Sequence, residues 1–251
     1  MRKRFEISCN LLMCITTLVI LTSGGAMWAQ DRAVTAQVQL IKRQTAAKAA
    51  KSSESQPDAS NVVLWLTPLD GNASPNASAP VPQLVQRNKS FEPHVLVVQV
   101  GASVQFPNRD PYFHNVFSLY DGKRFDLGLY EAGSTKTVHF DRPGVSFLFC
   151  NIHPEMSAVV IAVDSPYHAL SDRAGQISVA AVPDGRYRMH VWYERSLPED
   201  LKQLDRVVTI SAGERTLEPV RVIENPDFTL AHKNKYGQDY VPPPSSGYVH
   251  P

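Results

Sequence analysis

The chain has 251 residues, with 25 Lys and Arg against 24 Asp and Glu. Its net charge of +1 gives no basic excess, and this argues against a nucleic-acid partner. The length suggests one large domain or two small ones.

The N-terminus has the pattern of a secretory leader. Arg2, Lys3 and Arg4 precede an apolar run from Leu11 to Thr22, and small residues follow. The alternative is a membrane anchor, but a spanning helix needs about 20 apolar residues. We therefore predict a signal peptide over residues 1–29, a periplasmic or secreted protein and no stable membrane insertion.

Removing this leader would leave a single cysteine. Cys9 and Cys14 lie within it, so the exported chain keeps only Cys150. Exported proteins use cysteine mainly in disulfides, and one cysteine cannot pair within its own chain. Cys150 is then an intermolecular bridge, a buried inert thiol or a metal ligand.

Short alternating apolar segments dominate the chain after the leader. Turn residues separate them, a pattern typical of a β-sandwich or barrel. The expected strands are Val34–Ile41, Val62–Thr67, Val95–Val100, Ser103–Phe106, Asn115–Leu119, Ser134–Phe140, Val145–Phe149, Ala158–Val163, Ile177–Val182, Tyr187–Tyr193, Arg206–Ile210 and Glu218–Ile223. Gln44–Ser53 has no apolar face and is expected to be a solvated linker, and Gly71–Pro82 a loop. The sequence therefore predicts an all-β protein.

A soft-metal ligand pattern follows one of these strands. His153 and Met156 follow Cys150 in a C-x2-H-x2-M pattern, and His114 stands at the start of an earlier strand. Two imidazoles and a thiolate with a weak thioether are the ligands of blue-copper sites. Structural zinc prefers Cys and His alone, and hard cations prefer oxygen. Haem attachment and a thiolate-bridged binuclear copper centre both need a second cysteine, and the H-x-H pairs of multicopper oxidases do not occur. The pattern favours one copper ion and argues against oxidase chemistry.

Residues 83–164 resemble a cupredoxin, similar to plastocyanin and especially to amicyanin. The matching positions are Phe91, Pro93, Val98, Gly101, Val104, Phe106, Asn108, Asp110, His114, Asn115, Gly144, Cys150, His153 and Met156. The resemblance implies a Greek-key β-sandwich with one type 1 copper, held by His114, Cys150, His153 and Met156. It also implies that the amide of Asn115 helps to fix the ligand loop by hydrogen bonding. Redox partner proteins would then dock briefly near His153, through a small interface.

Residues 165–224 resemble a carboxypeptidase-regulatory-like β-sandwich. The matching positions are Ser171, Asp172, Gly175, Ile177, Pro183, Gly185, Tyr187, Met189 and Val191. Val34–Leu40 and Asn61–Leu66, within an N-terminal region at 30–82, fit its first strands, so the cupredoxin would be inserted into it. The alternative is a cupredoxin with β extensions at both ends. The Pro- and Tyr-rich tail at 225–251 is expected to be extended or irregularly docked.

Three functions remain open from the sequence. We expect an exported blue copper protein that carries single electrons between redox partners. The first alternative is copper delivery, storage or sensing without redox turnover, and the second is a structural sandwich whose Cys150 binds nothing. Neither a nucleophile triad nor a paired-carboxylate pattern stands out, so we expect no enzymatic activity. The oligomeric state stays open.

Overall fold

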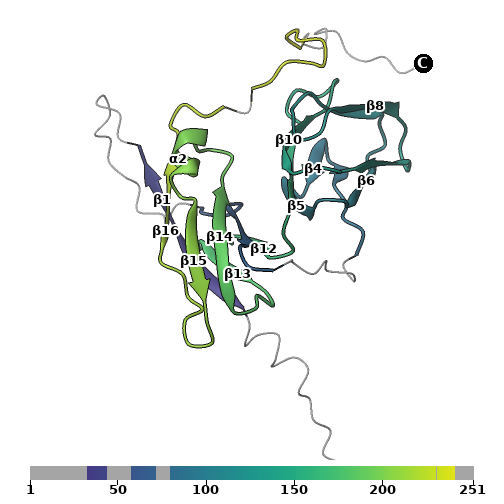
Figure 1. Cartoon of the computed structure of the whole chain (residues 1–251). Coiled ribbons are helices and arrows are strands. Elements are labelled where there is room, and N and C mark those ends of the chain that lie inside the picture. Colours follow the sequence, from purple (N-terminus) through teal and green to yellow (C-terminus); the bar gives the residue numbers. More distant parts are fainter. Residues whose placement is uncertain (1–32, 44–57, 72–79, 230, 241–251) are drawn as a thin grey trace, which may run out of the picture.

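The structure is a computed structural model that describes residues 33–43, 58–71, 80–229 and 231–240 (Figure 1). The predicted signal peptide and Gln44–Ser53 lie outside these ranges. Nearly all regular elements are strands, which confirms the all-β prediction. Within the described ranges, no helix is long and apolar enough to cross a membrane.

Two sheets form what we call the outer sandwich. The three-stranded sheet has the order β13–β1–β16, with β1 at Val34–Lys42, β13 at Gln176–Val179 and β16 at Val220–Glu224. The four-stranded sheet has the order β12–β2–β14–β15, with β2 at Val63–Pro68, β12 at His168–Leu170, β14 at Gly185–Trp192 and β15 at Arg206–Ile210. Alternate residues of β1 are buried, as in a strand with one face on a core. Apolar side chains of both sheets share this core, among them Leu64, Ile177 and Met189.

The pairing of β1 joins the two ends of the chain. Val34 lies opposite Val179 in antiparallel β13, and Val38 lies beside Val220 in parallel β16. The strands of the outer sandwich thus come from both sides of residues 83–164. Those residues form a second body, drawn on the right of Figure 1.

We call this second body the central sandwich. Its five-stranded sheet has the order β5–β11–β10–β7–β8, from Val95–Gln99 (β5), His114–Ser118 (β7), Phe125–Tyr130 (β8), Gly144–Phe149 (β10) and Ser157–Val163 (β11). Two small sheets accompany it, from Val85–Arg87 (β3) with Ser90–Glu92 (β4) and from Ser103–Pro107 (β6) with Thr135–His139 (β9). The core between these sheets contains Phe106, Tyr130 and Phe140, and it also includes Cys150 and Met156.

A third apolar cluster joins the two sandwiches. Val63 of β2 packs with Val95 of β5 and Ile161 of β11. Beside them His94 Nε2 lies 2.6 Å from a carboxylate oxygen of Glu194, which follows β14. The central sandwich is therefore packed against its neighbour.

All twelve predicted strands are present, with ends that shift by a few residues. The sequence analysis missed β3, β4, β8 and β12, as well as a five-residue helix, α2, at Pro198–Lys202. Three of the missed strands have only three residues, too few to show alternation. Strand β8 contains Gly128 in a left-handed conformation, and its pairing with β7 shifts register between Asn115 and Phe117. Such irregularity hides the two-residue period.

Candidate metal centre

Three predicted ligands meet at one end of the central sandwich. His114 is the first residue of β7, Cys150 follows the last residue of β10, and His153 lies in the turn between β10 and β11. Strands β7 and β10 pair antiparallel with Phe117 opposite Phe149, so the start of one strand lies near the end of the other. Sheet pairing therefore brings His114 to Cys150, and the short turn brings His153 to both.

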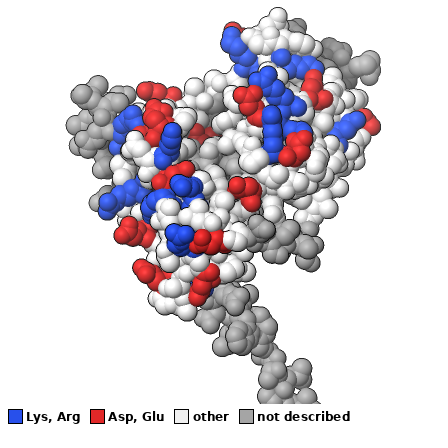
Figure 2. Space-filling model, viewed as in Figure 1, with Lys and Arg blue, Asp and Glu red and all other residues white. Residues whose placement is uncertain are grey.

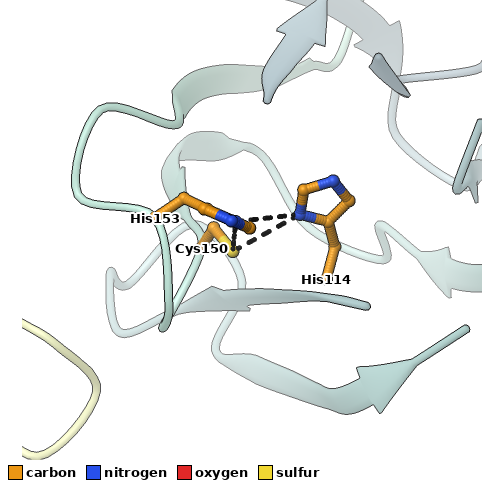
Figure 3. A group of neighbouring side chains, drawn as sticks. All are labelled: His114, Cys150 and His153. Atoms are coloured by element: carbon orange, nitrogen blue, oxygen red, sulfur yellow. Dashed lines mark hydrogen bonds between the residues drawn. The ribbon is translucent and has the colours of Figure 1, made fainter. Parts of the chain in front are cut away.

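The three donor atoms form a tight triangle (Figure 3). His114 Nδ1 lies 3.1 Å from His153 Nδ1, and Cys150 Sγ lies 3.9 Å from the first and 3.6 Å from the second. Ligand atoms about 2.0–2.3 Å from one ion can be at most about twice that distance apart, so all three separations suit a shared metal. His114 and Cys150 are buried and His153 is partly exposed. A nitrogen, nitrogen and sulfur set favours copper or zinc over hard cations.

Met156 lies next to this triangle in the fold. Its side chain is fully buried in the same apolar cluster as Cys150. The backbone closes the turn, since Met156 N–H donates to His153 O at 3.1 Å and Cys150 N–H donates to Met156 O at 3.3 Å. The assignment of Met156 as the fourth ligand stays a prediction.

Asp110 holds the ring of His114, and the sequence analysis missed this role. His114 Nε2 lies 2.8 Å from Asp110 Oδ2, and the same carboxylate accepts from the N–H groups of Asn88 at 2.6 Å and Lys89 at 2.8 Å. Burial opposes the ionisation of Asp110, but these hydrogen bonds outweigh it and lower its pKa. A carboxylate at Nε2 places the ring proton there and leaves the Nδ1 lone pair facing the triangle.

The charge states of the donors suit a site that is completed by a cation. Burial raises the pKa of the Cys150 thiol, although N–H groups of Asn115, Ile152 and His153 act in the opposite direction. Burial, together with the nearby His114, lowers the pKa of His153. His153 is thus neutral and ligand-competent at neutral pH, whereas the thiolate needs a positive partner.

The side chain of Asn115 bonds to strand β8. Its side-chain amide donates to Asp126 Oδ1 on β8 at 2.7 Å, and its side-chain oxygen is buried without a hydrogen-bond partner. Only its backbone N–H faces the Cys150 thiol. The predicted role of Asn115 beside the ligands stays a prediction, and the structure gives it a contact with Asp126 that the sequence did not suggest.

The C-terminal segment also reaches this end of the molecule. Tyr240 Oη donates to Cys150 O at 2.6 Å, and Lys235 N–H donates to Asn151 Oδ1 at 3.0 Å. The tail has no apolar period, so no sequence signal indicated these contacts. Other described histidines lie apart from the triangle, where His94 pairs with Glu194, His139 with Ser103 and His190 with Asp205.

Exposed aromatic and aliphatic side chains lie next to His114 and His153 in the sequence. Tyr112 is 48% exposed, Phe113 57% and Ile152 43%. Tyr112 also meets the ring of His114 edge-on, with centroids 6.4 Å apart. Charged groups lie nearby as well, since Lys89 Nζ is 5.5 Å from the centre of the Tyr112 ring and both Lys89 and Glu155 act on the pKa of His153.

Comparisons with known proteins give matches only among solved structures. No protein-family profile and no curated protein sequence matches the chain. The "Novel Purple Cupredoxin from Nitrosopumilus maritimus" is 23% identical over 33% of this chain and 99% of its own, with a TM-score of 0.30. A Cu(I) structure of an amicyanin mutant is 17% identical over 40% of this chain and 98% of its own, with a TM-score of 0.32.

A copper-containing nitrite reductase from Thermus scotoductus also matches. It is 20% identical over 49% of this chain and 28% of its own, with a TM-score of 0.32. The prediction that the chain is not an enzyme was wrong as it stood, because the solved structures similar to it include an enzyme. Nothing in the described residues shows whether this protein is an enzyme. Similarities this low carry no argument about its chemistry, which rests on the residues themselves.

Proposed function

We propose that this protein binds one copper ion at His114, Cys150 and His153, with Met156 as a weak axial ligand, and carries single electrons. The observation that carries the proposal is the triangle of Nδ1, Sγ and Nδ1 atoms, each 3.1–3.9 Å from the next. Bound there, copper would alternate between Cu(I) and Cu(II) and so hold or release one electron.

The residues around the triangle would keep its geometry the same in both states. Asp110 orients His114, and the paired strands β7 and β10 fix His114 relative to Cys150. The turn hydrogen bonds between Cys150, His153 and Met156 hold the remaining donors. A donor set held in this way rearranges little when the charge of the ion changes, and this favours rapid electron transfer.

Partner docking is part of the same proposal. The exposed side chains of Tyr112, Phe113 and Ile152, next to His114 and His153 in sequence, suit a brief encounter with a redox protein through a small interface. On the face seen in Figure 2, basic and acidic side chains lie beside one another over both sandwiches. This mixture supports a protein partner over nucleic acid. We also propose that the protein is exported to the periplasm or secreted.

We further propose that the outer sandwich is a separate, carboxypeptidase-regulatory-like domain, interrupted by the central one. Its support is the pairing of β1 with both β13 and β16 around a core of its own. Calorimetry should then show two unfolding transitions, and copper should raise the midpoint temperature of only one of them, because a ligand stabilises the unit that binds it. A single unfolding transition whose midpoint temperature rises with copper would argue that the two sandwiches unfold as one unit.

The test of copper binding compares optical and EPR spectra of the Cu(II)-loaded protein with those of Cys150→Ser and His139→Gln. His139 is exposed and lies outside the triangle, so its variant is the matched control. An intense thiolate-to-copper absorption that is lost only in Cys150→Ser supports the proposal. A weak spectrum that Cys150→Ser leaves unchanged refutes it.

The second candidate function is copper handling without redox turnover. The rates of copper loss and of electron self-exchange distinguish it from electron transfer. The partly exposed edge of His153 gives a chelator a route to the ion. Copper that a mild chelator removes rapidly, together with slow electron self-exchange, would favour delivery or storage. Retained copper with fast self-exchange would favour electron transfer.

A further inference from the structure

The C-terminal strap, residues 225–229 and 231–240, crosses from the outer sandwich to the central one. Figure 1 shows it as the yellow trace that leaves β16 and passes above β10. The ring of His232 stacks on Phe149, with centroids 3.9 Å apart and planes at 25°. Phe149 is the last residue of β10, so the strap meets the sheet at the residue before Cys150.

Tyr240 contacts the backbone of Cys150 itself. Its hydroxyl donates to Cys150 O at 2.6 Å and lies 3.2 Å from His232 Nδ1. Because β10 ends at Phe149, Cys150 lies outside the strand, where the strap supplies this donor. Burial raises the pKa of Tyr240 to about 12, so the hydroxyl keeps its proton at neutral pH.

Lys235 makes two further contacts near the ligand residues. Its N–H donates to Asn151 Oδ1 at 3.0 Å, and its ammonium group donates to Asp126 Oδ2 at 2.7 Å. The other oxygen of Asp126 accepts from Asn115, the residue after His114. A turn in the strap presents Lys235, since Asn234 Oδ1 accepts from the N–H groups of Tyr236 and Gln238.

The contacts of His232, Lys235 and Tyr240 with the central sandwich share one property. Each is made with a predicted ligand, with its neighbour in sequence, or with a residue that is hydrogen-bonded to such a neighbour. The strap therefore ties the segment that bears Cys150 to the segment that bears His114, from outside the sheet. The strap contacts named above involve none of the exposed side chains of Tyr112, Phe113 and Ile152. Such support around ligands sets the geometry and affinity of a metal site.

We propose that Tyr240 and Lys235 are positioning residues for the candidate metal centre, and that the strap holds the Cys150 backbone in ligand geometry before the metal arrives. The inference rests on the proposed copper function for its effect on the metal. Its effect on the hydrogen exchange of residues 150–156 does not depend on copper binding.

The experiment therefore uses the full chain in two states. In the metal-free protein, hydrogen–deuterium exchange of the peptide spanning residues 150–156 reports how firmly the turn is held. In the copper-loaded protein, the EPR spectrum and the rate of copper transfer to a chelator report the site. The variants are Tyr240→Phe, which keeps the ring and removes the hydroxyl, Lys235→Met, and Lys235→Arg as the conservative rescue. Lys233→Met is the control, because Lys233 lies in the same strap and its 62% exposed side chain pairs with the exposed Asp239.

We expect Tyr240→Phe to raise exchange at residues 150–156 about fivefold, as for the loss of one net hydrogen bond. It should also alter the EPR spectrum and speed copper transfer several-fold. Lys235→Met should act in the same direction, Lys235→Arg should restore most of the effect, and Lys233→Met should match the wild type.

Two outcomes would overturn the proposal. If Tyr240→Phe leaves both exchange and copper transfer unchanged, the strap does not hold the turn. If exchange rises while the EPR spectrum and the transfer rate stay the same, the strap is structural only. A wild-type protein that takes up no copper refutes the proposed function instead, and the exchange result then decides alone whether the strap holds this segment.

Discussion

Asp110→Asn tests whether the buried carboxylate behind His114 governs the candidate metal centre. Asp110 Oδ1 accepts from Asn88 N–H, and Oδ2 accepts from both Lys89 N–H and His114 Nε2. An asparagine of the same shape has one acceptor oxygen in place of two. In either amide orientation, at least one of these donors then faces an NH2 group.

The magnitude follows from that count. A buried donor left unsatisfied costs about 1–3 kcal/mol, and hydrogen bonds to a charged group are worth about 1.5–3 kcal/mol each. We therefore expect Asp110→Asn to lower the free energy of unfolding of the metal-free protein by about 2–4 kcal/mol. The ring of His114 also loses the partner that fixes its tautomer, so copper affinity should fall by about 10–100-fold.

Urea unfolding of the metal-free protein measures the first effect, and competition with a copper chelator measures the second. Asp121→Asn is the control, because its side chain is 89% exposed and pairs only with Arg124 on the same turn. Copper affinity within threefold of the wild type, in a folded Asp110→Asn protein, would refute the reasoning about His114. Unchanged stability would refute the reasoning about these donors, of which His114 is buried and the N–H groups of Asn88 and Lys89 are partly buried.

Two further predictions concern the scaffold. Gly122→Ala places a Cβ 2.5 Å from the backbone oxygen of Val145, so the free energy of unfolding measured in urea should fall by about 1–3 kcal/mol. The control, Gly213→Ala, meets open space and should be neutral or slightly stabilising. Equal effects of the two substitutions would contradict this. The hydrogen bond with Glu194 raises the pKa of His94, although burial acts against it. The pair therefore stabilises the fold fully below the pKa that His94 has in the unfolded chain, and this stabilisation is lost as the pH rises through its pKa in the folded protein. The stability difference between the wild type and His94→Gln should therefore shrink above about pH 6.5, and a difference that stays constant would count against the ion pair.

The sequence predicted those strands whose side chains alternate between a core and solvent. Strand β1 shows this plainly, since its buried and less buried residues alternate from Val34 to Val38. Strands β3 and β4 have three residues each and carry no such period. Helix α2 begins at Pro198 and has one buried residue, too few for an apolar face.

Part of the candidate site was likewise predictable from the sequence, and part of it was not. Cys150 and His153 are three residues apart in a tight turn, so their spacing alone indicated a shared site, and His114 was found at a strand start. The role of Asp110 depends on the conformation of the segment between β6 and β7, which the pattern N-x-D does not specify. The contacts of Lys235 and Tyr240 depend on where the tail docks, and docking of an aperiodic segment leaves no local signal.

The pairing of β1 with β16 has a consequence for how the chain reaches its native state. Gln39 and Arg221 lie side by side in this parallel pair, although 182 residues separate them in sequence. A contact this distant closes a long loop, and folding slows as such contacts predominate. During synthesis, β1 emerges early and stays without this neighbour until nearly the whole chain has followed. We therefore expect the central sandwich to fold first and the outer one to form only when β16 is available, with β1 as the segment most exposed to misassembly in the interval.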